Sequence, residues 1–287
     1  MDKLKPLIRS LRPHQWMKNL LIFIPLIAAH TTELYTIKNT ILIFFGFCAI
    51  SSAGYLFNDI LDRKSDKAHP IKKERPIPKG ELSVKTATLT ATGLLILTLP
   101  ALITINWAVG ITALIYILLT GTYSKFLKHQ KYTDIFILSC FSLIRVHAGG
   151  QAADVEISQW LFAFIFSVSI SIAAAKRSIE IQKIKDIHLT RKNYGDKDLT
   201  LCNITGVNWA LIASFVLSIY IMEQAPDNYE NPDILWFPWA AFSIWFLHFW
   251  DRTSKGVTLS DPVKCIITNP YSYLAGTIMI AGFLSAI

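Results

Sequence analysis

Long apolar segments recur along the whole chain and are separated by polar loops. Most of them approach the length of about 20 residues that a helix needs to cross the hydrocarbon core of a bilayer. The pattern predicts nine such helices, at residues 19–36, 39–58, 86–103, 106–123, 133–152, 158–176, 203–222, 234–250 and 268–286. We therefore expect an all-α, polytopic membrane bundle of about nine transmembrane helices, forming one domain over residues 1–287.

The overall composition supports this fold class. Hydrophobic residues make up 52% and aromatic residues 12% of the chain, and the mean hydropathy is +0.40. Such values exclude an ordinary soluble domain and predict a protein whose main partner is the lipid bilayer.

Basic side chains gather in alternate loops. Of the 28 Lys and Arg residues, 26 lie before the first apolar segment or in the loops at 59–85, 124–132, 176–202 and 251–267. Cytoplasmic loops of membrane proteins accumulate Lys and Arg, so we expect these loops and the N-terminus on the cytoplasmic face of the plasma (inner) membrane. An odd number of helices then places the C-terminus outside. This pattern accounts for the net charge of +8, so no nucleic-acid partner is expected.

Cysteines and the N-terminus add little. The four cysteines are widely spaced and are expected to be small apolar packing residues. A basic, Pro-containing start precedes the first apolar segment, and it lacks the features of a cleavable signal peptide, so the first helix is expected to remain in the mature protein.

Three carboxylates stand in the first long polar loop. Asp59, Asp62 and Asp66 are spaced i, i+3 and i+7, so they share one face if the preceding helix continues past the membrane surface. Like charges stacked in this way favour a cation among them. Hard oxygen ligands suit Mg²⁺ or Mn²⁺, with remaining ligands supplied by substrate phosphates, and Asn58 adds an amide at the rim. The alternative is a solvated helix end whose acids are neutralised by neighbouring cations.

A basic, proline-rich stretch follows these acids. Its prolines are expected to stop the helix and hold the segment in extended conformations, so that its cations can grip a phosphate or diphosphate. The alternative is an anchor to anionic lipid. The residues concerned are His69, Lys72, Lys73, Arg75 and Lys79, interspersed with Pro70, Pro76 and Pro78.

These motifs resemble a known family. The run Asn58-Asp59-x-x-Asp62-x-x-x-Asp66 is similar to the first acidic motif of the UbiA superfamily of intramembrane prenyltransferases. Its extension through Arg75-Pro76 and Gly80 resembles the decaprenyl-phosphate phosphoribosyltransferase branch. Three further stretches agree, and together they cover about residues 9–185: Arg12-Pro13-x-Gln15-Trp16-x-Lys18-Asn19; Tyr123-Ser124-x-x-Leu127-Lys128 with Asp134, then Leu143-Ile144-Arg145-x-x-Ala148-Gly149-Gly150; and Lys176-Arg177-x-x-Glu180.

The resemblance implies that phosphoribosyl diphosphate gives its ribose 5-phosphate to a polyprenyl phosphate, such as decaprenyl phosphate, and releases diphosphate. Asp59, Asp62 and Asp66 would hold Mg²⁺, while Lys72 and Arg75 contact donor phosphates. The opposing wall would consist of Tyr123, Lys128 and Asp134, with Asp134 a second metal contact or an orienter of Lys128. The residues expected to act in catalysis are Asp59, Asp62, Arg75 and Lys128.

Five further residues are weighed individually. Lys18 either reaches a phosphate or anchors the first helix at the interface. Arg145 lies inside an apolar segment, where an unpaired guanidinium is costly, so it should face the interior and meet an acid or a substrate anion. Lys176 and Arg177 either bind the 5-phosphate or the lipid phosphate, or cap a helix, with Glu180 pairing one of them.

The sequence departs from the family pattern in two places. Ser178 and Ile179 replace a more polar or aromatic pair, and the C-terminal acidic motif is reduced to Ser260-Asp261-Pro262. These changes concern the acceptor rather than the donor. Lipid length is not fixed by the sequence, and a homo-oligomer stays open.

Two other functions remain at this point. A UbiA-type prenyltransferase, moving a polyprenyl group from its diphosphate to an aromatic or other small acceptor, would use the same metal site but need fewer cations. A carrier or scaffold would place polar residues near mid-membrane, whereas here they gather at one face with Arg145 as the exception.

Overall fold

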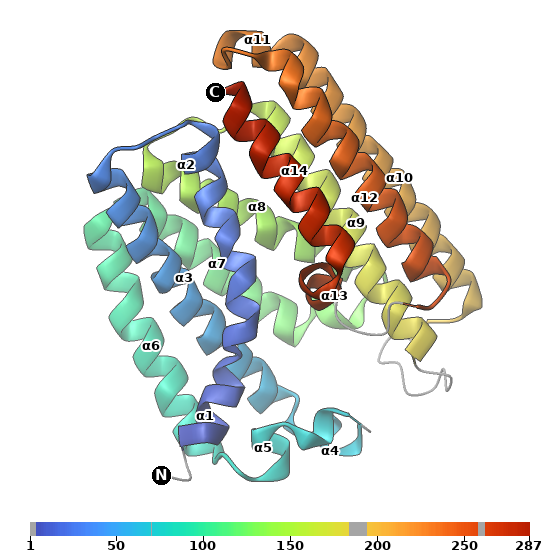
Figure 1. Ribbon diagram of the computed structural model, residues 1–287. Helices are drawn as coiled ribbons and strands as arrows, with labels where there is room; N and C mark the ends of the chain where they lie inside the picture. The colour runs from blue at the N-terminus through green and yellow to red at the C-terminus, as the bar shows by residue number, and fades with distance from the viewer. Residues whose placement is uncertain (1–3, 70, 184–193, 258–261) are drawn as a thin grey trace. The chain divides into compact units, whose positions relative to one another are not determined.

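The computed structural model describes residues 4–69, 71–183, 194–257 and 262–287, and these ranges contain helices and loops but no β-strand (Figure 1). Contacts between residues divide the chain into two compact units. Unit 1 comprises Met1–Gln130 and Phe141–Ile157, and unit 2 comprises Lys131–Cys140 and Ser158–Ile287.

Unit 1 is built around one long helix. Helix α3 packs against α6, α7 and η1, and the short helices α1, α4 and α5 gather at one end of this group (Figure 1). The elements of this unit are α1 (Leu4–Leu11), the 3₁₀ helix η1 (Pro13–Phe23), α2 (Ile24–Ala28), α3 (Leu34–Leu61), α4 (Arg63–Ala68), η2 (Lys72–Glu74), α5 (Pro76–Lys79), α6 (Val84–Ile105), α7 (Trp107–Lys125), η3 (Leu127–His129) and most of α8 (Thr133–Ala153).

Side-chain caps define the ends of the hairpin of α6 and α7. Ser83 accepts a hydrogen bond from the Thr86 amide at the start of α6, and Asn106 accepts one from the Ala108 amide at the start of α7. The side-chain amide of Asn106 also donates to the backbone carbonyl of Gln151, 3.0 Å away in α8. This one asparagine therefore ends one helix, starts the next and ties both to α8.

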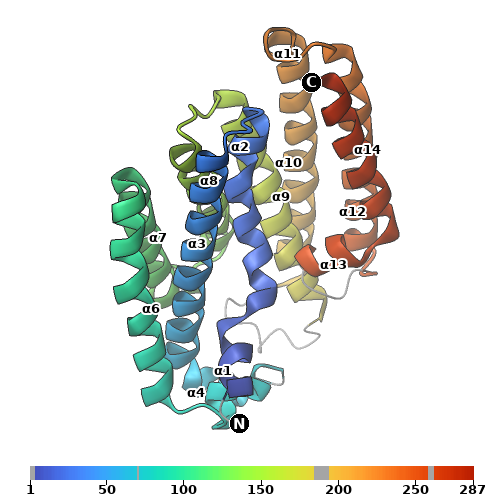
Figure 2. The same cartoon turned by 60° about the vertical axis from the view of Figure 1, so that its left-hand side comes forward.

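Unit 2 is a second helical group. Helices α9 and α10 pack together over much of their length, and α12 packs on both α10 and α14 (Figure 2). The elements that follow the start of α8 are α9 (Gln159–Lys183), α10 (Asp196–Glu223), α11 (Ala225–Asn228), η5 (Pro232–Leu235), α12 (Trp236–Ser254), α13 (Pro262–Thr268) and α14 (Pro270–Ala286).

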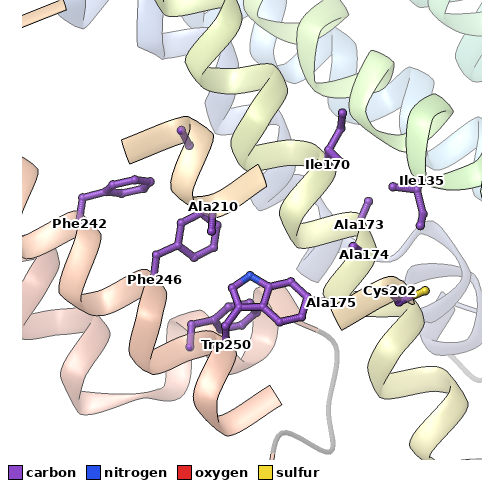
Figure 3. Close-up of a cluster of buried hydrophobic side chains, with 12 residues drawn as sticks. Ile135, Ile170, Ala173, Ala174, Ala175, Cys202, Ala210, Phe242, Phe246 and Trp250 are labelled. Atoms are coloured by element: carbon purple, nitrogen blue, oxygen red, sulfur yellow. The ribbon is translucent and has the colours of Figure 1, made fainter. Parts of the chain in front are cut away.

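The core of unit 2 combines aromatic side chains of α12 with small side chains of α9 and α10. Figure 3 shows Phe242, Phe246 and Trp250 directed toward this small-residue surface. The indole of Trp250 donates to Ser171, whose hydroxyl donates to the carbonyl of Gly206. Small residues allow helices to approach closely, which is the usual basis of helix packing in membranes.

The structure contains candidate membrane spans. Six of them, α3 and α6 to α10, are long and apolar enough to cross a bilayer, with mean hydropathies of 1.3 to 1.9. Helices α12 and α14 form where segments were predicted at 234–250 and 268–286, but they are not among the six. The expected count of nine spans and the sides of the termini therefore stay predictions.

The first expected segment, 19–36, does not form one helix. The chain runs as η1 and α2 to Ala28, and α3 then begins at Leu34. Between them lie the polar residues from His30 to Glu33, and His30 has the left-handed backbone angle φ of 52°. The prediction was wrong because it continued an apolar run across a polar turn.

Candidate active site

The three acids of the first polar loop lie on the buried side of the junction between α3 and α4. Asp59, Asp62 and Asp66 are 1%, 7% and 0% exposed. The amide of Asp66 donates to the carbonyl of Asp62, four residues back, so helical hydrogen bonding continues through the junction. Arg63 and Lys64 point to solvent. The predicted shared face of the three acids is therefore confirmed.

Arg75 joins the first and last of these acids. One guanidinium nitrogen, Nη1, lies 2.9 Å from Asp59 Oδ1 and 2.7 Å from Asp66 Oδ2. Arg75 directly precedes helix α5, where Ile77, only 1% exposed, packs in a hydrophobic cluster with residues of α3 and α6. Docking of α5 thus fixes the position of Arg75.

The described part of the proline-rich segment is helical, which differs from the extended conformation expected. It contains η2 and α5, and Pro76 and Pro78 lie inside the latter. Proline suits the first turn of a helix because its missing N–H would have no partner there. Gly80, at φ 89°, ends α5 in a left-handed conformation that favours glycine. Pro70 lies outside the described residues.

Lys128 covers the middle acid. Its ammonium lies 2.6 Å from Asp62 Oδ1 and 3.2 Å from Asn58 Oδ1, and its side chain is 8% exposed. It belongs to η3, which follows α7. Residues 58 and 128, which sequence reasoning assigned to one site on separate grounds, are thus brought together by the packing of α7 on α3.

Arg12 is the cation that sequence reasoning missed. Its Nη2 lies 2.6 Å from Asp59 Oδ1, the same oxygen that Arg75 contacts. Arg12 was assigned no role beyond membership of an N-terminal motif. Its pairing with a residue 47 positions away depends on how η1 packs along α3 and has no local signal.

The donor set fits a divalent cation in chemistry, because it offers three buried carboxylates and an amide oxygen on one helical face. As the side chains are arranged, Arg12, Arg75 and Lys128 contact the acids. Among the described residues no three His, Cys, Asp or Glu side chains converge as metal ligands. A metal that bound these carboxylates would compete with the three cations for their oxygens.

Three other residues assigned to substrate binding are half-buried in unit 1. Lys72 is half-buried in η2, and its amide donates to Nδ1 of His69, 3.3 Å away. Lys18 is half-buried on η1. Tyr123 is half-buried near the end of α7 and packs edge-on against Phe141.

Arg145 lies in the interior of unit 1, as expected, and its described partners are neutral. The guanidinium donates to Asn19 Oδ1 and to the hydroxyl of Tyr116, each at 2.7 Å, and to the carbonyl of Phe141 at 2.8 Å. Arg145 is 5% exposed. No carboxylate pairs with it among the described residues, and its binding of a substrate anion stays a prediction.

Unit 2 holds a separate charged group. Asp134, fully buried in the first turn of α8, pairs with Nε of Arg177, and Tyr194 donates to the other oxygen of Asp134. Arg177 also pairs with Glu180, as predicted. Lys176 is half-buried beside them in sequence. These contacts favour an ion pair over a metal for Asp134, whose assignment as a ligand stays a prediction.

A second set of contacts in unit 2 was missed by sequence reasoning. The hydroxyl of Tyr132 donates to Asp198, and Lys131 lies 3.0 Å from the same carboxylate. The bond to Asp198, followed by partial burial, raises the pKa of Tyr132 to about 12. Burial likewise raises the pKa of Tyr194, whose ring lies under Lys131.

A comparison with known families decides the identity of this fold. The family described as "UbiA prenyltransferase family" matches residues 19–250. The chain belongs to this family. The resemblance inferred from the acidic motif is thereby confirmed, and the protein is a membrane-embedded member of a family of transferases.

Curated relatives of the chain include two kinds of enzyme. A decaprenyl-phosphate phosphoribosyltransferase from Mycolicibacterium smegmatis is 38% identical over 61% of this chain and 57% of the relative. A digeranylgeranylglyceryl phosphate synthase from Sulfolobus acidocaldarius is 28% identical over 60% of both chains. The chain spans little more than half the length of the curated relatives it matches.

Solved structures share the fold. A UbiA homolog from Archaeoglobus fulgidus, bound to DMAPP and Mg²⁺, superposes with a TM-score of 0.76 over 97% of this chain and 98% of the homolog. At 16% sequence identity this likeness concerns the fold alone.

Proposed function

We propose that this protein transfers the 5-phosphoribosyl group of phosphoribosyl diphosphate to a polyprenyl phosphate, such as decaprenyl phosphate, and releases diphosphate. The observation that carries the proposal is the buried group of Asp59, Asp62 and Asp66 with Arg12, Arg75 and Lys128. It combines ligands for a divalent cation with several phosphate-binding cations. The similarity to a phosphoribosyltransferase from Mycolicibacterium smegmatis supports the choice of donor.

The proposed reaction needs little proton chemistry. An oxygen of the lipid phosphate forms a bond to the anomeric carbon of the ribose, and the bond from that carbon to diphosphate breaks with its electron pair. The nucleophile is already ionised, so no general base is required. The main demand on the protein is to stabilise negative charge that develops on the leaving diphosphate.

Residues of the cluster divide into two roles. Asp59, Asp62 and Asp66 would hold Mg²⁺ or Mn²⁺, which supplies charge neutralisation to the leaving group. Arg75 and Lys128 lie against these carboxylates and would contact the diphosphate, Arg75 with a two-pronged donor. Our proposed catalytic set consists of Asp59, Asp62, Arg75 and Lys128.

Other residues extend the proposed substrate site. Asn58 already accepts a bond from Lys128 and marks the rim of the acidic face. Lys18, Lys72 and Tyr123 are half-buried in unit 1 and are assigned to substrate binding.

Arg145, Lys176 and Arg177 are assigned to anionic groups of donor or acceptor. The buried guanidinium of Arg145 has only neutral described partners, which supports an anion as its further ligand. Asp134 pairs with Arg177, so its first proposed role is to orient that side chain. Metal binding by Asp134 is retained as a second proposed role.

The membrane arrangement is part of the proposal. Nine spans, with the N-terminus and the active site on the cytoplasmic face of the plasma membrane and the C-terminus outside, follow from the distribution of Lys and Arg. The accessibility of engineered cysteines from each side of the membrane tests this orientation.

A second function has support of its own. The relative from Sulfolobus acidocaldarius and the DMAPP-bound homolog from Archaeoglobus fulgidus act on or bind prenyl groups. The alternative is therefore a prenyltransferase that moves a polyprenyl group from its diphosphate to an aromatic or other small acceptor. The number of cations around the acids favours phosphoribosyl transfer.

The deciding experiment uses membranes that contain the full chain. They are incubated with radiolabelled phosphoribosyl diphosphate, polyprenyl phosphate and Mg²⁺, with wild type compared with Asp59→Ala, Arg75→Ala and, as a control, Arg63→Ala at an exposed position of α4. We expect labelled lipid from wild type and the control, none from the other two, and none after chelation. A parallel incubation supplies a polyprenyl diphosphate and an aromatic acceptor. Its consumption there, with no labelled lipid in the first assay, would establish the alternative.

A further inference from the structure

The segment around Arg12 is tied to α3 on both sides of that residue. Ser52 of α3 donates to the carbonyl of Leu11 and accepts from the indole of Trp16, both at 2.9 Å. The backbone of Arg12 between these tethers has φ 54° and ψ 59°. A non-glycine residue in this left-handed region is strained and persists only where surrounding contacts impose it.

This arrangement lays the side chain of Arg12 along one face of α3. Ser52, Tyr55 and Asp59 are spaced i, i+3 and i+7, so they follow each other on that face. The guanidinium lies 4.9 Å from the ring centre of Tyr55 and reaches Asp59. Its side chain retains 20% exposure, so it is not sealed within the protein.

Asp59 therefore has two cationic partners on one oxygen. Arg12 and Arg75 lie 2.6 and 2.9 Å from Oδ1, although one guanidinium would neutralise the charge. Together with Lys128, they bring the formal charge of the three-acid cluster to zero. A dication that entered this cluster would compete directly with Arg12 for Asp59.

We propose that Arg12 exchanges its partner: it holds Asp59 while the site is empty, and it binds diphosphate oxygens when a divalent cation takes Asp59. Stacking on Tyr55 would keep the guanidinium beside the site during this exchange. A planar fork suits phosphate oxygens as well as a carboxylate. The inference rests on the metal and diphosphate site of the proposed function, but not on which group is transferred.

The exchange makes two affinities move in opposite directions. Without Arg12, Asp59 has lost a competitor and the cluster carries a net negative charge, so a dication alone should bind more tightly. The same change removes a phosphate partner, so diphosphate with its metal should bind more weakly. A merely structural role of Arg12 would weaken both.

The test compares purified full-length wild type with Arg12→Gln, Arg12→Lys and Arg9→Gln in nanodiscs. Mn²⁺ alone is titrated by electron paramagnetic resonance, and inorganic diphosphate in excess Mg²⁺ by calorimetry. Arg9 is the matched control, because it lies three residues earlier and meets Glu81 at 3.4 Å, outside the cluster. Asp59 keeps Arg75 in every variant, which limits the risk of misfolding.

For Arg12→Gln we expect about tenfold tighter Mn²⁺ and about tenfold weaker diphosphate, the size of one hydrogen bond to a charged group. Arg12→Lys should bind Mn²⁺ with the affinity of wild type, and its affinity for diphosphate should lie between those of wild type and Arg12→Gln. Arg9→Gln should change neither affinity. Weakening of both affinities, no change in either, or absence of Mn²⁺ binding to wild type would overturn the inference. If Mn²⁺ binds more tightly and diphosphate more weakly as expected, but the protein transfers no phosphoribosyl group, only the proposed donor is overturned.

Discussion

Lys128 and Asp62 form a buried ion pair that joins η3 to the end of α3. Their charged atoms are 2.6 Å apart, and the two side chains are 8% and 9% exposed. Removal of one partner from such a pair leaves a buried charge without compensation.

We expect Lys128→Met to lower the free energy of unfolding by about 3 kcal/mol, the lower range for a broken buried pair. Asp62→Asn should also destabilise the protein, and the double variant should be more stable than the sum of the single changes implies. Chemical unfolding in detergent measures all three. Lys125→Met, at an exposed position on α7, serves as the control, and strict additivity would contradict the pairing.

Gly206 permits close packing of α10 against Trp250 of α12. A Cβ atom at this position would lie 1.9 Å from the ring of Trp250. We expect Gly206→Ala to destabilise the protein by about 2 kcal/mol, because overpacking shifts Trp250 and its bond to Ser171. Gly93→Ala in α6 is the matched control, since a Cβ there meets no atom within 4 Å. An equal effect of both substitutions on the unfolding temperature would argue against this packing.

The hydroxyl of Tyr116 is one of three acceptors around Arg145. Tyr116→Phe keeps the ring but leaves Nη2 of Arg145 without this bond, so we expect a loss of about 1 kcal/mol in unfolding free energy. Tyr35→Phe, at a 69% exposed position, should have no measurable effect. Equal stability of Tyr116→Phe and wild type would show that the bond contributes nothing.

The bond between Tyr132 and Asp198 should make the stability of the protein depend on pH in the alkaline range. Its bond to Asp198 raises its pKa from 10.0 to about 12, because the neutral phenol donates that bond. A raised pKa means that this contribution to stability is complete below pH 10 and is lost as the pH rises toward 12. The phenolate absorbance of wild type minus that of Tyr132→Phe should titrate near pH 12, and Asp198→Asn should lower the midpoint. A wild-type midpoint near 10 would refute the bond.

Sequence reasoning found the acidic face and two of its three cations. The spacing of Asp59, Asp62 and Asp66 is a local property of a helix, so it could be predicted without tertiary information. Arg75 was found as a phosphate-type cation in the basic stretch after the acids, and Lys128 through resemblance to a family motif. The helical form of Pro76–Lys79 was not foreseen, since proline starts a helix as well as ending one.

The contacts of Arg12 and Asp134 were out of reach for a different reason. Arg12 meets a residue 47 positions away, and Asp134 meets Arg177 in another helix. A cation in a loop carries no sign of which acid it will contact. The break between Ala28 and Leu34 was also missed, because hydropathy alone does not register a short polar turn.

The sequence by itself determined that this is a helical membrane protein with an acidic face at the end of its second predicted segment, because apolar run length and helical spacing are local quantities. Tertiary structure alone decided how those acids are compensated. Packing of η1, α5 and η3 brings Arg12, Arg75 and Lys128 onto Asp59, Asp66 and Asp62, and the burial of charge makes such pairing energetically necessary.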